Sequence, residues 1–574
     1  MRTAIVLIVF AAVFIGLTVD CYRQESATAD EPQQLTTGYT ALVLKDYRLD
    51  PEHPPLLRMW AALPLWMMSD VRLNTNAVSW TSVKPREFPH QFLYVDNDAD
   101  RLLNRARFMN AVLGVLLGIL LFCWSRELFG FWPAVVALGL FCFEPNTVAH
   151  FGLVTTDSVA CLIFGTLYFL WRTARRLTSA NLVGLTVFFA LAQAGKFTAL
   201  ILYPIALLVL VVHALRNGAW PCTLGRWDDL ATRAQRLMAV TGIWLLLAVA
   251  SYVTLWAVYS FRYAPSPGGT GLDRIVAGPV AHRRVPKLAA AIDWIDEHHL
   301  LPNVYTQGFL LGQAAAQDRT AYLLGQISYT GWWYYFPVAV LVKTPVALLI
   351  LFFAGLALCG RECTSGRFHD DLFFLIPLFL YLGASLPMKL NIGIRHILPL
   401  YPLVVLVGGK TFAAAFASKR RQWLVVVAAL CLLEVAEVAA VHPHELAFFN
   451  LFVGGPKNGY KYLADSNLDW GQDLKNLKKW MDANHVDRIN LSYFGSADPV
   501  YYGIACNYLR GSPAFIPTNQ IVLPTLPGLV AVSVNNLTGV NLQGEQFYKP
   551  LLDREPVTVI GYSIRIYQAD RPWW

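Results

Sequence analysis

Apolar runs long enough to cross a membrane recur through this sequence and constrain its fold more than any other feature. One helix needs roughly 20 apolar residues to cross the hydrocarbon layer. Hydrophobic residues make up 56% of the 574 residues, and charged residues only 15%. The sequence therefore predicts a polytopic α-helical membrane protein. About eleven candidate spans lie near 3–19, 107–125, 131–146, 152–171, 182–195, 197–215, 237–260, 333–358, 371–387, 397–417 and 423–441.

Two of these spans leave an alternative open. The first run follows Arg2 and ends near small residues, so it also fits a cleaved signal peptide. We favour an uncleaved span, because many other apolar runs follow. The fifth and sixth runs are separated by "AGK" at Lys196, so they form either two full helices or one broken pair.

Basic residues in alternate loops predict the orientation. If Met1 lies inside the cell, every inner loop carries Arg or Lys, as the positive-inside rule requires. These loops read "SRELFG", "RTARRLTSAN", residues 216–236, "GRECTSGR" and "SKRRQ". A net charge of +8 then reflects membrane orientation and does not indicate nucleic-acid binding. On the outer side then lie a first loop at 20–105, a second loop at 261–332, and the chain after residue 442.

The last part of the chain changes character and predicts a second domain. "DLKNLKKWMDANH" has helical spacing, whereas "RINLSYFG", "GLVAVSV" and "IGYSIRIYQA" have the alternation or β-branched content of strands. We therefore expect a transmembrane module at 1–441 and a small extracytoplasmic α/β domain at 442–574. Cys21 and Cys506 share the predicted outer side, which allows one disulfide.

Several ionisable residues lie in or beside predicted spans, where charge is costly and often functional, and three of them are candidate site residues. Asp157 lies near the outer start of the fourth span, and either caps a helix with Thr155 or forms the floor of an outward-facing pocket. Arg395 either snorkels to lipid headgroups or binds a lipid-linked phosphate, for which an arginine fork has suitable geometry. Lys343 presents the same choice.

The first outer loop predicts two helices lying in the membrane interface. One runs over about Leu35–Leu44, and the other follows Pro54 and Pro55 with apolar and aromatic residues on one side. Such helices would hold four nearby polar residues at the membrane surface: Asp30, Glu31, Glu52 and His53.

Several motifs in a fixed order resemble the phospholipid-carrier-dependent glycosyltransferases of the GT-C superfamily, close to the protein O-mannosyltransferases and the aminoarabinose transferases. The resemblance covers about residues 28–475. Its motifs are the first-loop "DE", "DPEHPPL", "HFGLVTTDS", "GQISYTGWWYYFPVAVLVKTP", "NIGIRHILPLYP" and "FFNLFVGGPKNGYKYLADSNLDWGQDL".

The resemblance implies a hexosyl- or pentosyltransferase that moves a sugar from a polyprenyl-phosphate donor to an extracytoplasmic hydroxyl of a protein, glycan or lipid. It also implies a bacterial inner membrane as the location. Asp30, Glu31 and Asp157 match the catalytic acids. Arg395, His53 and Lys343 are the residues assigned to the donor phosphate, although His53 stands where the aminoarabinose transferases have a phosphate-facing Lys. Candidate acceptor or sugar contacts are Glu52, His150, Tyr329, Trp332 and Asp469.

Two of these contacts keep a structural alternative. Asp469 lies in "DSNLDWGQDL", whose acids also suit helix capping and domain docking. Trp332 belongs to "GWWYY", which also fits an aromatic belt at the membrane interface. No cofactor is required, and a divalent metal held by Glu52 and His53 stays an open alternative, since two ligands do not establish a site.

The chemistry is consistent with an inverting transfer. An attacking hydroxyl needs a base, whereas a departing phosphate needs only charge stabilisation, so one working carboxylate and nearby cations suffice. A hydrolase of glycosidic bonds would require two opposed carboxyl groups. The alternatives from other classes are a lipid or solute transporter and a non-catalytic envelope assembly protein.

Overall fold

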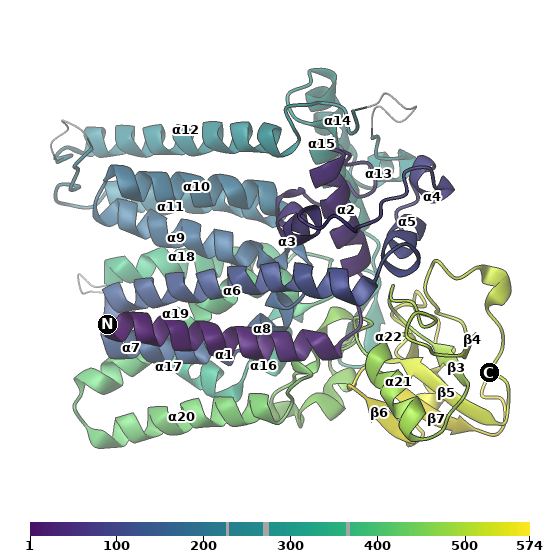
Figure 1. Cartoon of the computed structure of the whole chain (residues 1–574). Coiled ribbons are helices and arrows are strands. Elements are labelled where there is room, and N and C mark those ends of the chain that lie inside the picture. The colour runs from purple at the N-terminus through teal and green to yellow at the C-terminus, as the bar shows by residue number, and fades with distance from the viewer. Residues whose placement is uncertain (225–228, 268–274, 363–367) are drawn as a thin grey trace.

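The computed structural model describes residues 1–224, 229–267, 275–362 and 368–574. A bundle of long helices forms most of the molecule, and the C-terminal domain lies at one end of it, opposite the N-terminus (Figure 1). We call this the domain end of the bundle. The bundle helices are α1 (Arg2–Gln24), α6 (Ala99–Phe129), α7 (Phe131–Cys142), α8 (Pro145–Phe151), α9 (Val159–Arg175), α10 (Ser179–Gly195), α11 (Leu202–Ala214), α12 (Arg233–Val258), α16 (Tyr335–Lys343), α17 (Val346–Arg361), α18 (Phe368–Ser385), α19 (Tyr401–Ala417) and α20 (Arg421–Ala439).

These helices confirm a multi-pass membrane protein. Within the described residues, seven helices are long and apolar enough to cross a membrane. Two bent pairs, α7 with α8 at 63° and α16 with α17 at 119°, raise the number to as many as nine. The larger count of about eleven stays a prediction. The fourth predicted span differs in its start, because a 3₁₀ turn at Thr156–Ser158 precedes α9.

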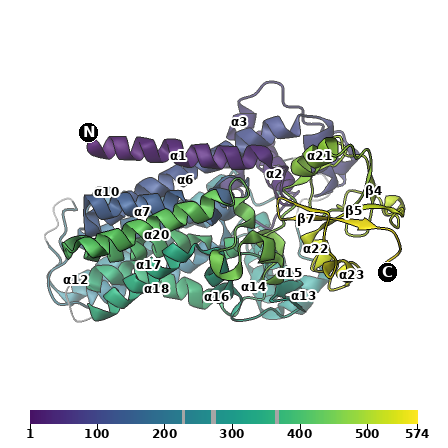
Figure 2. The same cartoon turned by 90° about the horizontal axis from the view of Figure 1, so that it is seen from below.

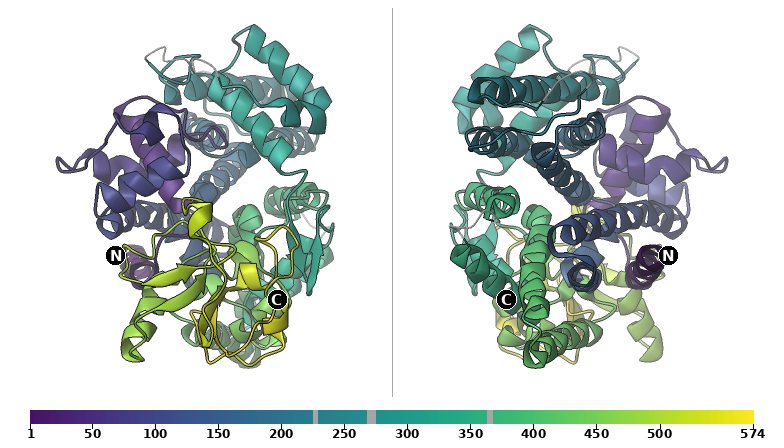
Figure 3. Two further views of the ribbon diagram at one scale, coloured as in Figure 1. Left: turned by 90° about the vertical axis from the view of Figure 1, so that its right-hand side faces the viewer. Right: turned by 90° about the vertical axis from the view of Figure 1, so that its left-hand side faces the viewer.

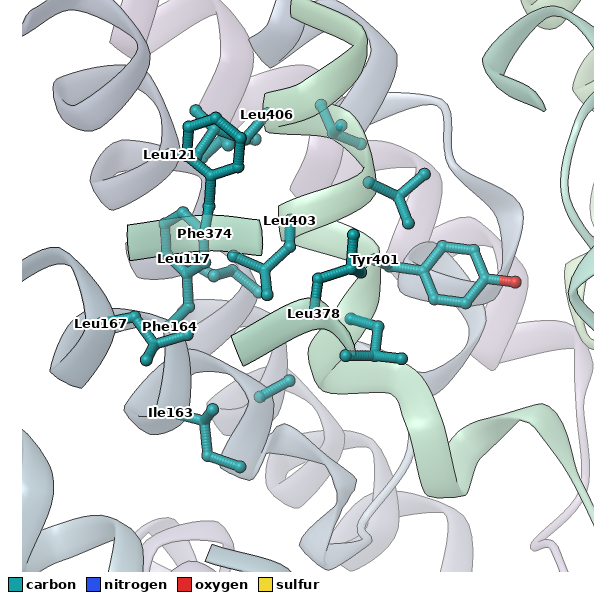
Figure 4. Packing of buried hydrophobic residues seen from close by; sticks show 14 of the residues in the cluster. Leu117, Leu121, Ile163, Phe164, Leu167, Phe374, Leu378, Tyr401, Leu403 and Leu406 are labelled. Carbon is teal, nitrogen blue, oxygen red and sulfur yellow. The ribbon is translucent and has the colours of Figure 1, made fainter. Parts of the chain in front are cut away.

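Side chains from several helices fill the core between them. Phe164 on α9, Phe374 and Leu378 on α18, and Leu403 and Leu406 on α19 gather in one apolar cluster (Figure 4). All five are less than a tenth exposed. Close packing of this kind gives transmembrane helices a defined arrangement, since lipid is as apolar as the side chains themselves.

Small residues allow α1 to approach α6 closely. A Cβ atom at Gly114 would lie 2.5 Å from the Phe14 ring, and one at Gly118 would lie 2.2 Å from the Phe10 ring. Both distances are shorter than a carbon contact permits, so only glycine fits at these two positions. The first helix is thus packed against the bundle by two phenylalanines lying over two glycines.

Lys196 marks a break between helices, as predicted. Helix α10 ends at Gly195, and a 3₁₀ segment, Phe197–Ile201, leads into α11. The break places Lys196 at the domain end of the bundle, where it is 6% exposed.

Short helices from two long loops surround the domain end (Figure 3). The two helices expected in the first loop are confirmed, as α2 (Glu31–Val43) and α3 (Leu56–Trp66). The remaining elements of the two loops are α4 (Val78–Thr81), α5 (Glu87–His90), α13 (Pro279–Arg284), α14 (Pro286–Glu297), α15 (Asn303–Ala315) and the hairpin β1 (Ala321–Leu323) with β2 (Gln326–Ser328).

The C-terminal domain contains a five-stranded mixed sheet, which lies at the same end as α2 and α3 (Figure 2). The strand order is β4-β3-β5-β7-β6, with β4, β3 and β5 parallel and β7 antiparallel to β5 and β6. The three predicted strands and the predicted helix are confirmed. The elements are α21 (Leu474–Ala483), β3 (Ile489–Ser492), β4 (Cys506–Tyr508), β5 (Gly528–Ser533), α22 (Val534–Leu537), α23 (Lys549–Leu552), β6 (Thr558–Ile560) and β7 (Ile564–Ala569).

The disulfide that the sequence allowed between Cys21 and Cys506 is not formed. Cys21 and Cys506 are both free thiols. Cys21 is buried and its Sγ lies 3.7 Å from Glu25 Oε1, while Cys506 belongs to strand β4. A shared side of the membrane therefore did not bring the two residues together.

His442 ties the last bundle helix to the first. Its Nε2 lies 2.9 Å from Asp20 Oδ2 on α1, and its Nδ1 is hydrogen-bonded to Glu445. The hydrogen bond with Glu445, together with the charges of Glu445 and Asp20, raises the pKa of His442 to about 9. The folded protein therefore holds this proton more tightly than the unfolded chain, in which the histidine pKa is about 6.5.

This stabilisation is fully present below the unfolded pKa and is lost as the pH rises through about 9. We expect the thermal unfolding temperature to fall as the pH is raised from about 7 to about 10, and to fall less in His442→Gln, because glutamine does not titrate. Thermal unfolding in detergent across this range measures both slopes. Equal slopes in the two proteins would contradict the role of His442.

Candidate functional site

Three distant segments meet at the domain end of the bundle. Asp30 directly precedes helix α2, Asp157 lies in the 3₁₀ turn before α9, and Arg395 lies in the segment before α19. The Arg395 Nη1 atom is 3.2 Å from Asp30 Oδ2 and 3.9 Å from Asp157 Oδ2. One guanidinium therefore joins the two acids that the sequence motifs single out.

Asp157 is fully engaged by its neighbours. Lys196 Nζ lies 2.5 Å from its Oδ1, and the Thr155 hydroxyl donates a hydrogen bond of 3.1 Å to its Oδ2. The Asp157 side chain is 1% exposed. Its geometry suits a residue that fixes the positions of Lys196 and Arg395, since a carboxylate held in this way has little freedom to accept another proton.

The polar "DSNLDWGQDL" segment holds Arg395 from the other side. The Arg395 Nε atom donates to Ser466 Oγ at 3.1 Å, and its guanidinium lies 4.2 Å from the centre of the Trp470 ring. Gly393 makes this contact sterically feasible, because a Cβ there would lie 2.2 Å from Ser466 Oγ. Asn467 Oδ1 accepts the Ile394 N–H at 2.9 Å. The segment thus docks the C-terminal domain onto the loop that carries Arg395.

Asp30 faces a cleft. Its side chain is 40% exposed, and it lines a cavity of about 310 Å³ between the first-loop helices and the C-terminal domain. Trp470 and the exposed Arg319 line the same cavity. Arg319 forms no ion pair or hydrogen bond with the residues that the structure describes. The cleft therefore brings one accessible carboxylate and one unpaired cation together.

Glu31, the neighbour of Asp30, is buried. Its two oxygens lie 2.8 and 2.6 Å from the guanidinium of Arg107, and it also accepts the N–H groups of Thr28 and Val154. Glu31 and Arg107 are both fully buried. This arrangement suits a structural role, because all the acceptor capacity of Glu31 is used inside the protein.

Lys343 is also buried. Its Nζ donates to the carbonyl oxygens of Leu446 and Asn467 at 2.9 and 2.7 Å, and it lies 4.9 Å from the centre of the Phe449 ring. The ammonium group therefore anchors the start of the C-terminal region, and its donors are already used within the protein.

Glu52 and His53 lie beside this site without the charge of a phosphate-binding residue. Burial lowers the pKa of His53 to about 4, so its imidazole is neutral at physiological pH. Burial and the nearby Asp50 and Asp30 raise the pKa of Glu52. Among the described residues, no group of three or more His, Cys, Asp or Glu side chains is arranged to hold a metal ion.

His150 and Asp469 are buried near Arg395 and the segment that docks it. The His150 ring packs edge-on against Trp470 at 6.0 Å. Asp469 accepts the N–H groups of Gly471 and Asn535 at 3.2 and 3.0 Å, and burial raises its pKa to about 8. These contacts match the docking alternative for Asp469.

Tyr329 and Trp332 make contacts elsewhere. The Tyr329 hydroxyl donates to the Gln543 carbonyl oxygen at 2.6 Å, which connects the second loop to the C-terminal domain. The backbone N–H of Trp332 donates to Asn391 Oδ1 at 2.7 Å. Neither residue lines the cleft that contains Asp30.

Residues 101–225 match a family model described as dolichyl-phosphate-mannose-protein mannosyltransferase. The match confirms the resemblance to the GT-C glycosyltransferases and the enzyme class. It covers a little over a fifth of the chain and includes both Asp157 and Lys196. No curated protein matches the chain at a significant level.

Two solved structures are similar to the chain at low identity. The archaeal oligosaccharyltransferase AglB from Archaeoglobus fulgidus, in complex with an inhibitory peptide and a dolichol-phosphate, has a TM-score of 0.46 at 12% identity, covering 94% of this chain and 71% of AglB. ArnT from Cupriavidus metallidurans bound to undecaprenyl phosphate has a TM-score of 0.31 at 11% identity, covering 98% of this chain and 97% of ArnT.

Three residues of the site were not singled out from the sequence. Lys196 was noted only as a break between apolar runs, although a cation at that depth is itself a signal of function. Ser466 and Arg319 carry no comparable signal, because a serine or arginine in a polar loop is ordinary. Their roles depend on loops that lie far apart in the sequence and meet only in the folded protein.

Proposed function

We propose that this glycosyltransferase moves a sugar from a polyprenyl-phosphate donor to an acceptor hydroxyl outside the cytoplasm, with inversion at the anomeric carbon. The observation that carries the proposal is the juxtaposition of an accessible carboxylate, Asp30, with Arg395 at the domain end of a membrane bundle. The mannosyltransferase family match supports a lipid-phosphate donor.

Asp30 is the proposed base. The acceptor oxygen attacks the anomeric carbon and forms a new C–O bond, while the bond between that carbon and the phosphate oxygen breaks. The hydroxyl proton passes to Asp30, and the electron pair of the broken bond stays on the phosphate. Asp30 suits this role better than Asp157, because its side chain is 40% exposed and that of Asp157 is 1% exposed.

Arg395 and Arg319 are the proposed contacts of the donor phosphate. The phosphate is a good leaving group once its charge is neutralised, and an arginine fork matches its oxygens. Arg395 is held in place by Ser466 and Trp470, so its position is preorganised. Arg319 is free to turn toward a ligand. We assign no cofactor. Lys343 and Glu31 have structural roles in this mechanism.

The orientation follows from the loop charges. The basic connections lie at the end opposite the C-terminal domain, so the positive-inside rule places that end in the cytoplasm and the cleft outside. We therefore place the C-terminus outside the cytoplasm, and the resemblance favours a bacterial inner membrane as the location. The cleft beside Asp30 is the proposed acceptor site, and the acceptor is a protein, glycan or lipid hydroxyl.

A transfer assay with Arg395→Met tests the proposal. Membranes or purified protein receive a panel of radiolabelled polyprenyl-phosphate sugars, and label in the acceptor fraction is measured. We expect the variant to lose about 100-fold or more in transfer rate, because one preorganised charge contact to a transition state is worth about this much.

Lys389→Met is the matched control. Lys389 is an exposed cation on the same segment, so its replacement should change the rate less than about two-fold. Equal losses of transfer rate in Arg395→Met and Lys389→Met would show that the positive charge of the segment sets the rate, and would contradict a specific Arg395 contact. Failure of the wild type to transfer sugar from any donor in the panel would overturn the proposed function.

A further inference from the structure

A second polar cavity lies at the end of the bundle opposite the C-terminal domain, and the proposed reaction does not use it. It measures about 270 Å³ and lies where the ends of α9, α11 and α18 meet. Figure 1 shows these ends on the left, opposite the C-terminal domain. The polar residues that line it are Arg175, His213, Arg216, His369 and Asp370.

The two histidines form a pair that leaves one N–H available. His213 Nδ1 lies 3.0 Å from His369 Nε2, so one ring donates a proton and the other accepts it. A neutral imidazole that accepts at one nitrogen carries its own proton on the other nitrogen. Whichever ring accepts, the pair therefore offers one further N–H donor. No described residue is hydrogen-bonded to that second nitrogen in either ring.

Arginines outnumber acids around this pair. Arg175 and Arg216 are exposed and form no ion pair within the described part of the chain. Asp370 is the only acid that lines the cavity, and its Oδ1 already accepts the Trp171 indole N–H at 2.9 Å. The cavity thus has a surplus of positive charge and of hydrogen-bond donors.

A buried arginine provides independent support. Arg236 on α12 is 4% exposed, and its Nε has no hydrogen-bond partner among the described residues. Arg236 lies near the start of α12, which packs against α11, the helix that carries His213 near its end. An exposed arginine at a helix end often extends to the headgroups at the membrane surface without forming a site. The buried Arg236 guanidinium does not reach the surface in this way. A buried cation without a partner indicates that an anion completes the site.

We propose that this cavity binds the phosphate headgroup of an anionic phospholipid. An arginine fork and an imidazole N–H are the donors that a phosphate prefers. A lipid is favoured over a soluble phosphate because Leu207 and Leu208 on α11, and Leu215 directly after it, are exposed, so acyl chains can run along the helix that carries His213. In the proposed orientation this is the inner leaflet.

Native mass spectrometry of the purified full-length chain tests the proposal. Phosphatidylglycerol and phosphatidylcholine are titrated into separate detergent samples, and bound lipids are counted. We expect one tight phosphatidylglycerol and no equivalent phosphatidylcholine. Arg216→Ala and Arg175→Ala should each raise the Kd for phosphatidylglycerol about ten-fold, because each removes one hydrogen bond between charged partners.

Arg421→Ala is the matched control, since Arg421 is an exposed arginine at the same end of the bundle and does not line the cavity. A Kd within about two-fold of the wild type is expected. An equal loss in Arg421→Ala, or equal binding of both lipids, would overturn the proposal. Displacement of phosphatidylglycerol by millimolar inorganic phosphate would also overturn it, because the site would then belong to a soluble phosphate.

Arg236→Gln provides a second readout by thermal unfolding. Phosphatidylglycerol should raise the unfolding temperature of the wild type, and this increase should be largely lost in the variant. An undiminished increase in a folded Arg236→Gln protein would contradict the role of Arg236. Neither measurement depends on transfer activity, so both can fail or succeed independently of the proposed function.

Discussion

Asp30→Asn should lower the rate of sugar transfer by about 100- to 10,000-fold, the range that a positioned general base contributes. Asparagine keeps the size of the side chain but cannot take the acceptor proton. The effect should appear in kcat, because the proton moves only in the transition state. Binding of the polyprenyl-phosphate donor should weaken much less, since Arg395 remains held by Ser466 and Trp470.

Initial rates with a radiolabelled donor measure the first effect, and donor binding to the detergent-solubilised protein measures the second. Glu87→Gln is the control, because Glu87 is an exposed acid in the same loop. It should retain a rate within about two-fold of the wild type. An Asp30→Asn enzyme within a few-fold of the wild type would remove Asp30 as the base.

Glu31→Ala should destabilise the protein by about 3–5 kcal/mol, the usual cost of removing one partner of a buried ion pair. The change leaves the fully buried Arg107 without its carboxylate. It also removes the acceptor for the Thr28 and Val154 N–H groups, so the segment that carries Asp30 loses its hydrogen bond to the turn before α9. Equilibrium unfolding in mixed detergent micelles measures the loss.

Glu127→Ala is the stability control. Glu127 pairs with Arg172 at 3.0 Å, but both side chains are more than a third exposed, so the expected loss is about 1 kcal/mol or less. If Glu31→Ala unfolds no more easily than Glu127→Ala yet has no activity, Glu31 acts in the chemistry. That result would contradict the structural role assigned to it here.

The sequence predicts those parts of the fold whose signals are local in the chain. The apolar runs predict the bundle helices, and the alternating segments predict β3, β5 and β7. The break at Lys196 was also visible, because a charge interrupts an apolar run. The disulfide that was allowed between Cys21 and Cys506 is not formed, since sharing one side of a membrane says nothing about distance within that side.

The candidate site was only partly visible from the sequence. Asp30, Asp157 and Arg395 were singled out by motif and burial pattern, and the structure brings them together. Lys343 and His53 were assigned to the donor phosphate. However, the Lys343 ammonium donates to carbonyl oxygens within the protein, and the His53 imidazole is neutral. The Lys343 contacts join residues more than a hundred positions apart, and the neutral His53 depends on its burial in the folded protein.

The sequence by itself determined that this chain is a membrane bundle with an α/β domain at one end, because the cost of placing residues in lipid depends on local composition. Only the tertiary structure decided which of the adjacent acids Asp30 and Glu31 is available for chemistry. Arg107 buries Glu31 with an ion pair across 76 residues, and Arg395 contacts Asp30 across 365. Contacts between residues so far apart in the chain form only when the whole chain folds.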